Sequence, residues 1–159
     1  MVAASQPSSL KDTWFGTRLS APALARLETH ARSVHYAAGD EILREGAETV
    51  ALGLVTSGRV ALRLRVPERG PTTIMTVEAG EIIGWSALLP PHRATSTVVA
   101  VTDTDLVLLD GEGLRAELER DPVLASAVYR SVLEALATRL TGTRMQLLDL
   151  FARPADEPW

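Results

Sequence analysis

The stretch Gly80–Leu89, GEIIGWSALL, decides the fold of this chain together with Pro90–Ala100, PPHRATSTVVA, which follows it directly. The pattern predicts the end of an apolar strand, a glycine turn, one short helical turn and then a new strand. The first N–H groups of such a helical turn have no partner within the turn, and together with the helix dipole they favour an anion, often a phosphate. Arg93 follows closely enough in the sequence to reach the same place.

Short strands separated by glycine turns precede this stretch, beginning near Ser33. The segment Arg59–Val66 alternates apolar residues with arginines, which is the period-two pattern of a half-buried strand. The other expected strands lie at 34–36, 41–44, 51–56, 72–77, 97–101 and 106–109. Roughly seven or eight short strands with a turn every 8–12 residues or so predict a sandwich, barrel or jelly roll.

Helical patterns flank the strands on both sides. Ser20 is a candidate N-cap for a short helix over residues 21–31, and Asp110 is one for a second short helix. Asp121–Pro122, a capping residue followed by proline, predicts the start of a long helix over about 122–151. A helix of about 30 residues is about 45 Å long and overhangs a domain of this size.

Mostly apolar residues recur along the long helix at alternating spacings of three and four, which is a heptad pattern. The row could pack on the β domain, but the length of the helix favours a homodimer through a partner helix. Gly142 interrupts the helix interior and either marks a close approach or has no role. The predicted dimerisation residues are Leu133, Leu136, Leu140, Thr143, Leu147 and Leu150.

Composition excludes several functional classes. The 159 residues suggest one domain, and the absence of cysteine excludes disulfides and thiolate metal sites. The three histidines do not have metal-ligand spacing, which also argues against a metal-binding cupin. A net charge of −4 argues against a DNA-binding surface. Signal-peptide and membrane-spanning patterns are missing, so we expect a cytoplasmic protein without membrane contact. The familiar catalytic motifs are also missing, so we expect no enzymatic activity.

A family resemblance is carried by three segments, Tyr36–Gly46, Leu54–Val60 and Gly80–Gly84. They resemble parts of the cyclic nucleotide-binding domain of the CRP/FNR regulator superfamily. Tyr36–Gly46 resembles the opening strands, Leu54–Val60 the glycine hairpin of the β roll, and Gly80–Gly84 the approach to the phosphate-binding cassette. The resemblance covers roughly residues 14–151. It implies a bacterial regulatory protein with a mainly β fold with helices, a double-stranded β-helix or jelly roll that carries a short N-terminal and a long C-terminal helix. The domain is expected at 13–151, between a flexible tail at 1–12 and a second tail at 152–159.

Two departures from the family pattern bear on the ligand. Family members that bind cyclic nucleotides have a glutamate after the cassette glycine, which accepts a hydrogen bond from the ribose, whereas this chain has Trp85. The alignment places Ala94 where the family has its phosphate-binding arginine, so Arg93 is one position early, and in a strand such a shift reverses the side chain. Trp85 either stacks on a planar ligand group or fills the pocket. Arg93 either clamps an anion or is solvated.

Our hypothesis is a non-enzymatic regulatory domain that senses a small anionic ligand, namely cAMP, cGMP or another nucleotide, in the β-roll pocket. It would signal through a dimerisation helix to a protein partner and would lack its own DNA-binding domain, because only eight residues follow Phe151. The alternative is a ligand-free protein–protein interaction or dimerisation module. The candidate ligand-binding residues are Ile83, Gly84, Trp85, Ser86, Ala87, Arg93, Thr95 and Ser96.

Overall fold

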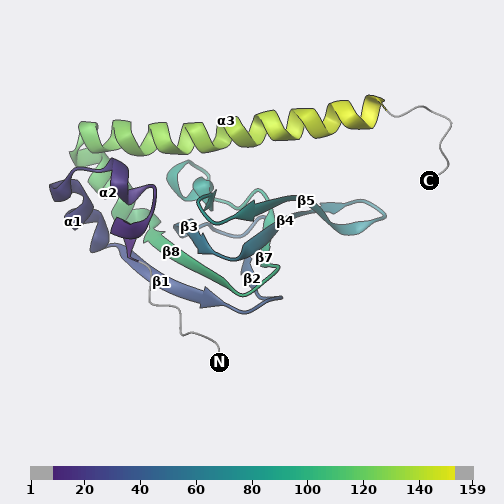
Figure 1. Cartoon of the computed structure of the whole chain (residues 1–159), viewed down its shortest axis with the longest axis horizontal. Coiled ribbons are helices and arrows are strands. Elements are labelled where there is room, and N and C mark those ends of the chain that lie inside the picture. Colours follow the sequence, from purple (N-terminus) through teal and green to yellow (C-terminus); the bar gives the residue numbers. More distant parts are fainter. Residues whose placement is uncertain (1–8, 153–159) are drawn as a thin grey trace.

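Two four-stranded antiparallel sheets form a β roll, and the helices gather at one end of it and along one side (Figure 1). The computed structural model describes residues 9–152. The sheets have the strand orders β1-β8-β3-β6 and β2-β7-β4-β5. The predicted jelly roll with helices is therefore confirmed. The strands are β1 (Ala31–Tyr36), β2 (Glu41–Leu43), β3 (Ala51–Ser57), β4 (Arg59–Val66), β5 (Gly70–Glu78), β6 (Ile82–Ile83), β7 (Thr97–Ala100) and β8 (Thr104–Asp110).

The helices begin at the predicted capping residues. The Ser20 hydroxyl accepts a hydrogen bond from the Ala23 N–H, and Asp110 accepts one from the Gly113 N–H at 2.8 Å. Asp121 accepts a bond from the Leu124 N–H at 3.0 Å and so begins the long helix. The helices are η1 (Leu10–Asp12), η2 (Gly16–Arg18), α1 (Ala21–Glu28), η3 (Trp85–Leu88), α2 (Gly111–Arg120) and α3 (Pro122–Ala152).

The N-terminal segment is more ordered than the sequence suggests. Residues 1–8 of the expected tail lie outside the described residues, but Leu10 is fully buried within η1 and packs in the same core cluster as Phe15. The domain therefore begins before residue 13. Helix α1 ends at Glu28 instead of residue 31, because Ala31 already pairs with Leu109 in the first sheet.

The core has two parts. One lies between the two sheets and contains Val60, Leu62 and Leu106. The other lies between the first sheet and the helices, where Leu52 and Leu109 meet residues of α1, α2 and α3. Because α3 covers this second part, its first half is a fixed component of the domain.

Helix α3 changes character along its length. Leu124, Val128 and Val132 are buried against the domain, whereas every residue from Leu140 to Ala152 is exposed. Figure 1 shows this second half lying above the β4–β5 side of the roll. Five residues of the predicted leucine row are exposed, and the sixth, Leu136, is partly buried against the core of its own domain. The helix is not long and apolar enough to cross a membrane, and neither is any other in residues 9–152.

Candidate functional site

The turn between β6 and η3 depends on Gly84. Its φ of 68° lies in the left-handed region, and an added Cβ would lie 2.6 Å from the Ala51 carbonyl oxygen in β3. The sequence therefore needs glycine here for two independent reasons. The result is a tight cassette, residues 82–96, that leads from β6 through η3 into β7.

Side chains from three different segments hold the carbonyl groups of this cassette. Arg139 of α3 donates to the Ile82 carbonyl at 2.7 Å, and Arg115 of α2 donates to the Ala87 carbonyl at 2.5 Å. His92 places Nδ1 3.2 Å from the Ser86 carbonyl oxygen. The cassette is thus tied to two helices and to its own loop.

A cavity of about 20 Å³ lies between the cassette, the roll and α3. Six of the eight predicted ligand residues line it. Apolar residues of β2, β4 and β7 and one arginine of α3 complete the wall. The full lining is Leu43, Leu62, Ile83, Gly84, Trp85, Ser86, Thr95, Ser96, Val98 and Arg139.

The two remaining predicted ligand residues point elsewhere. Arg93 is exposed and donates to the Gly46 carbonyl at 2.9 Å, so its guanidinium lies outside the cavity. Ala94, in the position of the family's arginine, is buried. This is the side-chain reversal that a one-residue shift produces next to a strand. Ala87 is buried but does not reach the cavity.

Trp85 and Ser86 are already engaged within the domain. Trp85 is partly buried and packs against the apolar cluster between the first sheet and the helices while it also lines the cavity. The Ser86 hydroxyl donates to the Thr49 hydroxyl at 2.8 Å. Of the two interpretations of Trp85, the geometry favours the one in which the indole fills the pocket.

Arg139 lines the cavity, and sequence reasoning missed it. Burial lowers the pKa of its guanidinium, and the charge of Glu81 partly opposes this. Its Nε is buried without a hydrogen-bond partner, and none of the ion pairs within residues 9–152 includes it. A signal existed in the sequence, because Arg139 follows Val132 and Ala135 at spacings of three and four on the face that packs on the domain.

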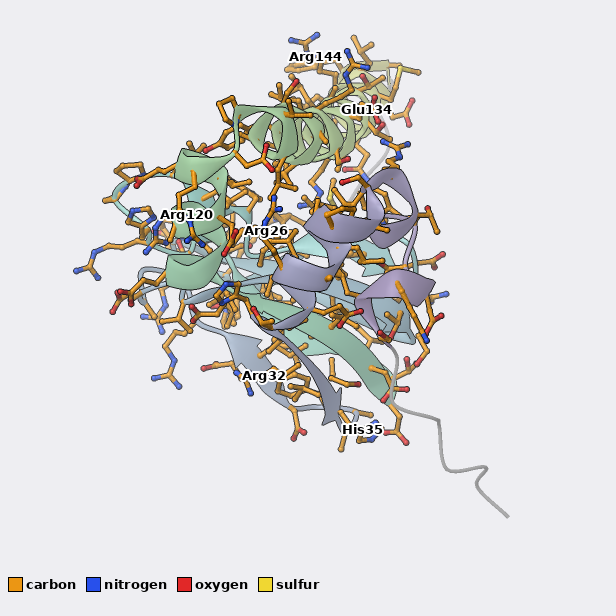
Figure 2. The ribbon with its side chains drawn as sticks, turned by 90° about the vertical axis from the view of Figure 1, so that its left-hand side faces the viewer. Arg26, Arg32, His35, Arg120, Glu134 and Arg144 are labelled. Atoms are coloured by element: carbon orange, nitrogen blue, oxygen red, sulfur yellow. The ribbon has the colours of Figure 1, made fainter. Side chains whose placement is uncertain are left out.

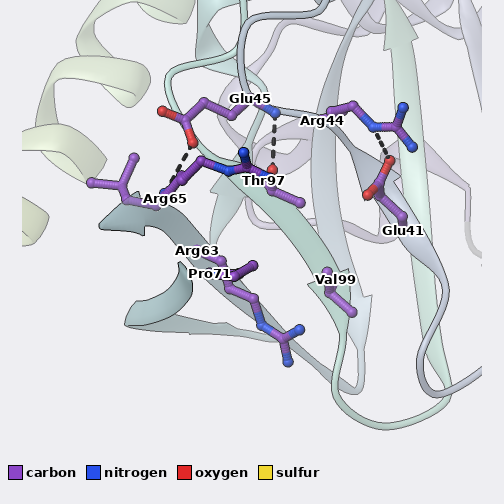
Figure 3. A pocket seen from close by; sticks show the side chains of 9 residues that line it. Glu41, Arg44, Glu45, Arg63, Arg65, Pro71, Thr97 and Val99 are labelled. Atoms are coloured by element: carbon purple, nitrogen blue, oxygen red, sulfur yellow. Dashed lines mark hydrogen bonds and ion pairs between the residues drawn. The ribbon is translucent and has the colours of Figure 1, made fainter. Parts of the chain in front are cut away.

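A second hollow, of about 560 Å³, lies on the outer face of the sheet β2-β7-β4-β5 (Figure 3). Arg63, Arg65 and Val99 line it, and they alternate with the inward-facing Leu62 and Val98. Figure 3 shows Arg44 directed at Glu41, and these two form an ion pair at 2.8 Å. Acidic and basic groups are mixed here, so the hollow has no single charge preference.

A buried carboxylate network joins α1 to α2. Glu117 is 5% exposed, and its carboxylate forms ion pairs with three side chains. These are Arg26 through Nε at 3.2 Å, His30 through Nε2 at 3.5 Å, and Arg120. Arg26 and Arg120 converge on this end of the domain in Figure 2. Burial alone would raise the pKa of Glu117, but Arg120, His30 and Arg26 together hold it below its ordinary value. The network stabilises helix packing and lies outside the cavity. No cluster of metal-ligating side chains occurs among the described residues.

Comparison with known proteins agrees with this architecture. The family profile named "Cyclic nucleotide-binding domain" matches residues 33–121, more than half of the chain. A CRP-like cAMP-activated global transcriptional regulator of Mycobacterium tuberculosis is 25% identical over 128 residues, which are 80% of this chain and 55% of that protein. The chain thus spans about half the length of this relative.

Two solved structures show how far the similarity extends in space. The N-terminal domain of a transcriptional regulator from Streptomyces coelicolor is 28% identical, with a TM-score of 0.63 over 94% of this chain and 99% of that one. A cyclic nucleotide-binding domain from Methylobacillus flagellatus has a TM-score of 0.76 at 24% identity, over 86% of this chain and 77% of that one.

Proposed function

The chain belongs to the cyclic nucleotide-binding domain family, and on that premise we propose that it is a non-enzymatic regulatory module that senses a small anionic ligand of the nucleotide class. The ligand would bind at the cassette, and α3 would carry the signal to a second copy of the chain and to a protein partner. One observation carries the proposal. Arg139 connects the cassette to the same helix whose other half is unpartnered in the single chain.

The cassette supports the ligand half of the proposal. A ligand site is supported by its glycine turn, its place beneath α3 and the six predicted residues around one cavity. The M. tuberculosis relative is described as cAMP-activated, which makes a cyclic nucleotide the first ligand to test. Trp85 offers no acceptor for a ribose hydroxyl. We therefore expect cAMP and cGMP to raise the Tm by little or nothing.

The exposed half of α3 supports the dimer. Leu140, Leu147 and Leu150 are 50–60% exposed, and Phe151 is 86% exposed. Such a row of apolar side chains on one helix is typical of a helix that packs on another one. A parallel pairing of two copies would cover it.

A second candidate function is the ligand-free interaction module. The specific observation in its favour is the small cavity, because about 20 Å³ holds roughly one water molecule and no nucleotide. In this case the cassette would only be a structural element, and α3 would act as a constitutive dimerisation surface.

A thermal-shift screen separates the two candidates. Cyclic and linear nucleotides are added at about 1 mM to the purified chain. A ligand at about 100 times its dissociation constant stabilises by about 2.7 kcal/mol. For a domain of this size that corresponds to a rise in Tm of roughly 5–10 °C. If no nucleotide raises the Tm, the ligand-sensing function is wrong and the ligand-free module is favoured.

Light scattering after gel filtration tests the dimer. We expect the wild type to have twice the chain mass of 17.1 kDa, and Leu147→Glu to have the mass of a single chain. Arg144→Gln is the matched control, because Arg144 is exposed on the same helix and projects away from the roll (Figure 2). A wild type that remains monomeric at high concentration would exclude the dimer.

A further inference from the structure

The cavity beneath α3 contains a partly buried positive charge without an anion among the residues that line it. Arg139 reaches it from α3, and its only hydrogen bond among the described residues goes to the neutral carbonyl of Ile82. A guanidinium has five N–H donors, and here the buried Nε has no acceptor. A buried cation normally has a partner of opposite charge. Glu81 acts on Arg139 only through its charge and does not form an ion pair with it.

Arg139 is also the only charged residue that lines the cavity in the part of the chain that the structure describes. Arg93, the cation that the sequence offers for this role, is bonded to the Gly46 carbonyl outside. The remaining polar side chains of the lining are Ser86, Thr95 and Ser96 (besides the indole of Trp85), and the Ser86 hydroxyl already donates to Thr49. An anion in this cavity would therefore have to pair with Arg139.

From these contacts we propose that Arg139 is the counter-ion for a phosphate group of the ligand, and that phosphate binding draws its guanidinium away from the Ile82 carbonyl. The inference rests on the proposed ligand-sensing function and specifies its chemistry. Guanidinium binds phosphate through two parallel hydrogen bonds, and the unpartnered Nε together with one terminal nitrogen provides that pair of donors.

The size of the cavity makes this binding a switch. A space of about 20 Å³ holds roughly one water molecule, so a phosphate can enter only if side chains of the lining, Arg139 among them, move aside. The guanidinium must leave Ile82, and its backbone belongs to the helix whose free half begins at Leu140, the next residue. Phosphate binding and the position of α3 are thereby coupled. By linkage, a partner that holds α3 in its phosphate-bound position must raise the affinity for phosphate by the same factor by which phosphate raises the affinity for that partner.

Arg139→Gln tests the counter-ion, and Arg144→Gln is the control on the same helix. The probes are inorganic phosphate, cAMP, cGMP, 5′-AMP and uncharged adenosine, each titrated by calorimetry into wild type and variants. We expect at least one phosphate-bearing probe to bind the wild type and Arg144→Gln equally well. For Arg139→Gln we expect a loss of affinity on the order of 10–100-fold, the usual value of a charge-assisted bond. Adenosine should bind none of them tightly.

Arg139→Lys keeps the charge but not the pair of parallel donors, and we expect it to lie between wild type and Arg139→Gln. It also carries the test if Arg139→Gln fails to fold, which circular dichroism would reveal. Binding of inorganic phosphate alone would identify a free oxyanion as the ligand, and binding of nucleotides alone would identify a nucleotide phosphate. Either result supports the inference if the Arg139→Gln substitution weakens that binding as expected.

Two outcomes overturn the inference, and they differ from each other. If a probe binds wild type and Arg139→Gln equally, or if adenosine binds as tightly as 5′-AMP, then Arg139 is not the counter-ion while ligand sensing stands. If no probe binds the wild type, both the counter-ion and the proposed ligand-sensing function are wrong.

Discussion

Replacing Gly84 and Gly142 by alanine should change the stability of the domain in opposite directions. The chemical change is the same, one added methyl group. Gly84 has a φ of 68°, and the new Cβ would lie 2.6 Å from the Ala51 carbonyl oxygen. Gly142 lies in the interior of α3, and within a single chain a Cβ there has no neighbour within 4 Å.

The structure sets the size of both effects. At Gly84 the left-handed backbone costs an alanine roughly 1–2 kcal/mol. The Ala51 oxygen cannot move away easily, because Ala51 pairs with Asp110 in the first sheet, so we expect a total loss of roughly 2–4 kcal/mol. At Gly142 alanine favours the helix by about 1 kcal/mol. With roughly 2–4 °C per kcal/mol for a domain of this size, Gly84→Ala lowers the Tm by about 5–15 °C and Gly142→Ala raises it by about 2–4 °C.

Thermal unfolding followed by circular dichroism measures both variants in the same buffer. A Gly84→Ala variant that melts within about 1 °C of the wild type would refute the reasoning, because neither the left-handed backbone nor the close approach could then be present. A lower Tm for Gly142→Ala would show that a second helix lies close to this position, and it would place Gly142 within the α3 dimer.

Three further substitutions test the packing around the site. Leu10→Ala should lower the free energy of unfolding, measured in urea, by roughly 2–5 kcal/mol, because Leu10 is fully buried. A loss near zero would show that the N-terminal segment does not pack in the core. Arg115→Met removes the donor to the Ala87 carbonyl and should cost roughly 1–3 kcal/mol, whereas the exposed Arg69→Met should cost almost nothing. Glu117→Gln should destabilise at pH 7. The pKa of Glu117 is lowered in the folded state, so the carboxylate stabilises fully above its unfolded-state pKa and this stabilisation is lost as the pH falls through the folded-state pKa. The difference between wild type and Glu117→Gln should therefore narrow below about pH 4, and a constant difference would contradict the network.

The fold could be predicted from the sequence because its signals are local. Strand β4 begins and ends at the predicted residues, since alternation and flanking turns are properties of a few neighbouring residues. The caps at Asp110 and Asp121 act within one helical turn, and both were predicted correctly. The burial of Leu10 was not predicted, because it depends on a contact with a distant part of the chain.

The candidate site was predictable only where it is continuous in the sequence. Gly84, Trp85 and Ser86 follow one another, so the resemblance located them together. Arg139 reaches the same cavity from 55 positions after Gly84, and its contact depends on how α3 lies across the roll. A charged residue on the packed face of an amphipathic helix was the available hint, and only the structure connects it to the cassette.

The position of Arg139 supports the proposed signalling through α3. Before it, Val128 and Val132 anchor the helix to the domain, and after it every described residue of the helix is exposed in the single chain. The free part, residues 140–152, is about 20 Å long at 1.5 Å per residue. A tilt of about 10° at Arg139 would therefore move its end by roughly 3–4 Å, which is enough to change how two leucine rows interlock, since helix packing depends on side-chain register. A small tilt of α3 at Arg139, next to the cassette, thus becomes a displacement of several ångströms at the proposed dimer surface.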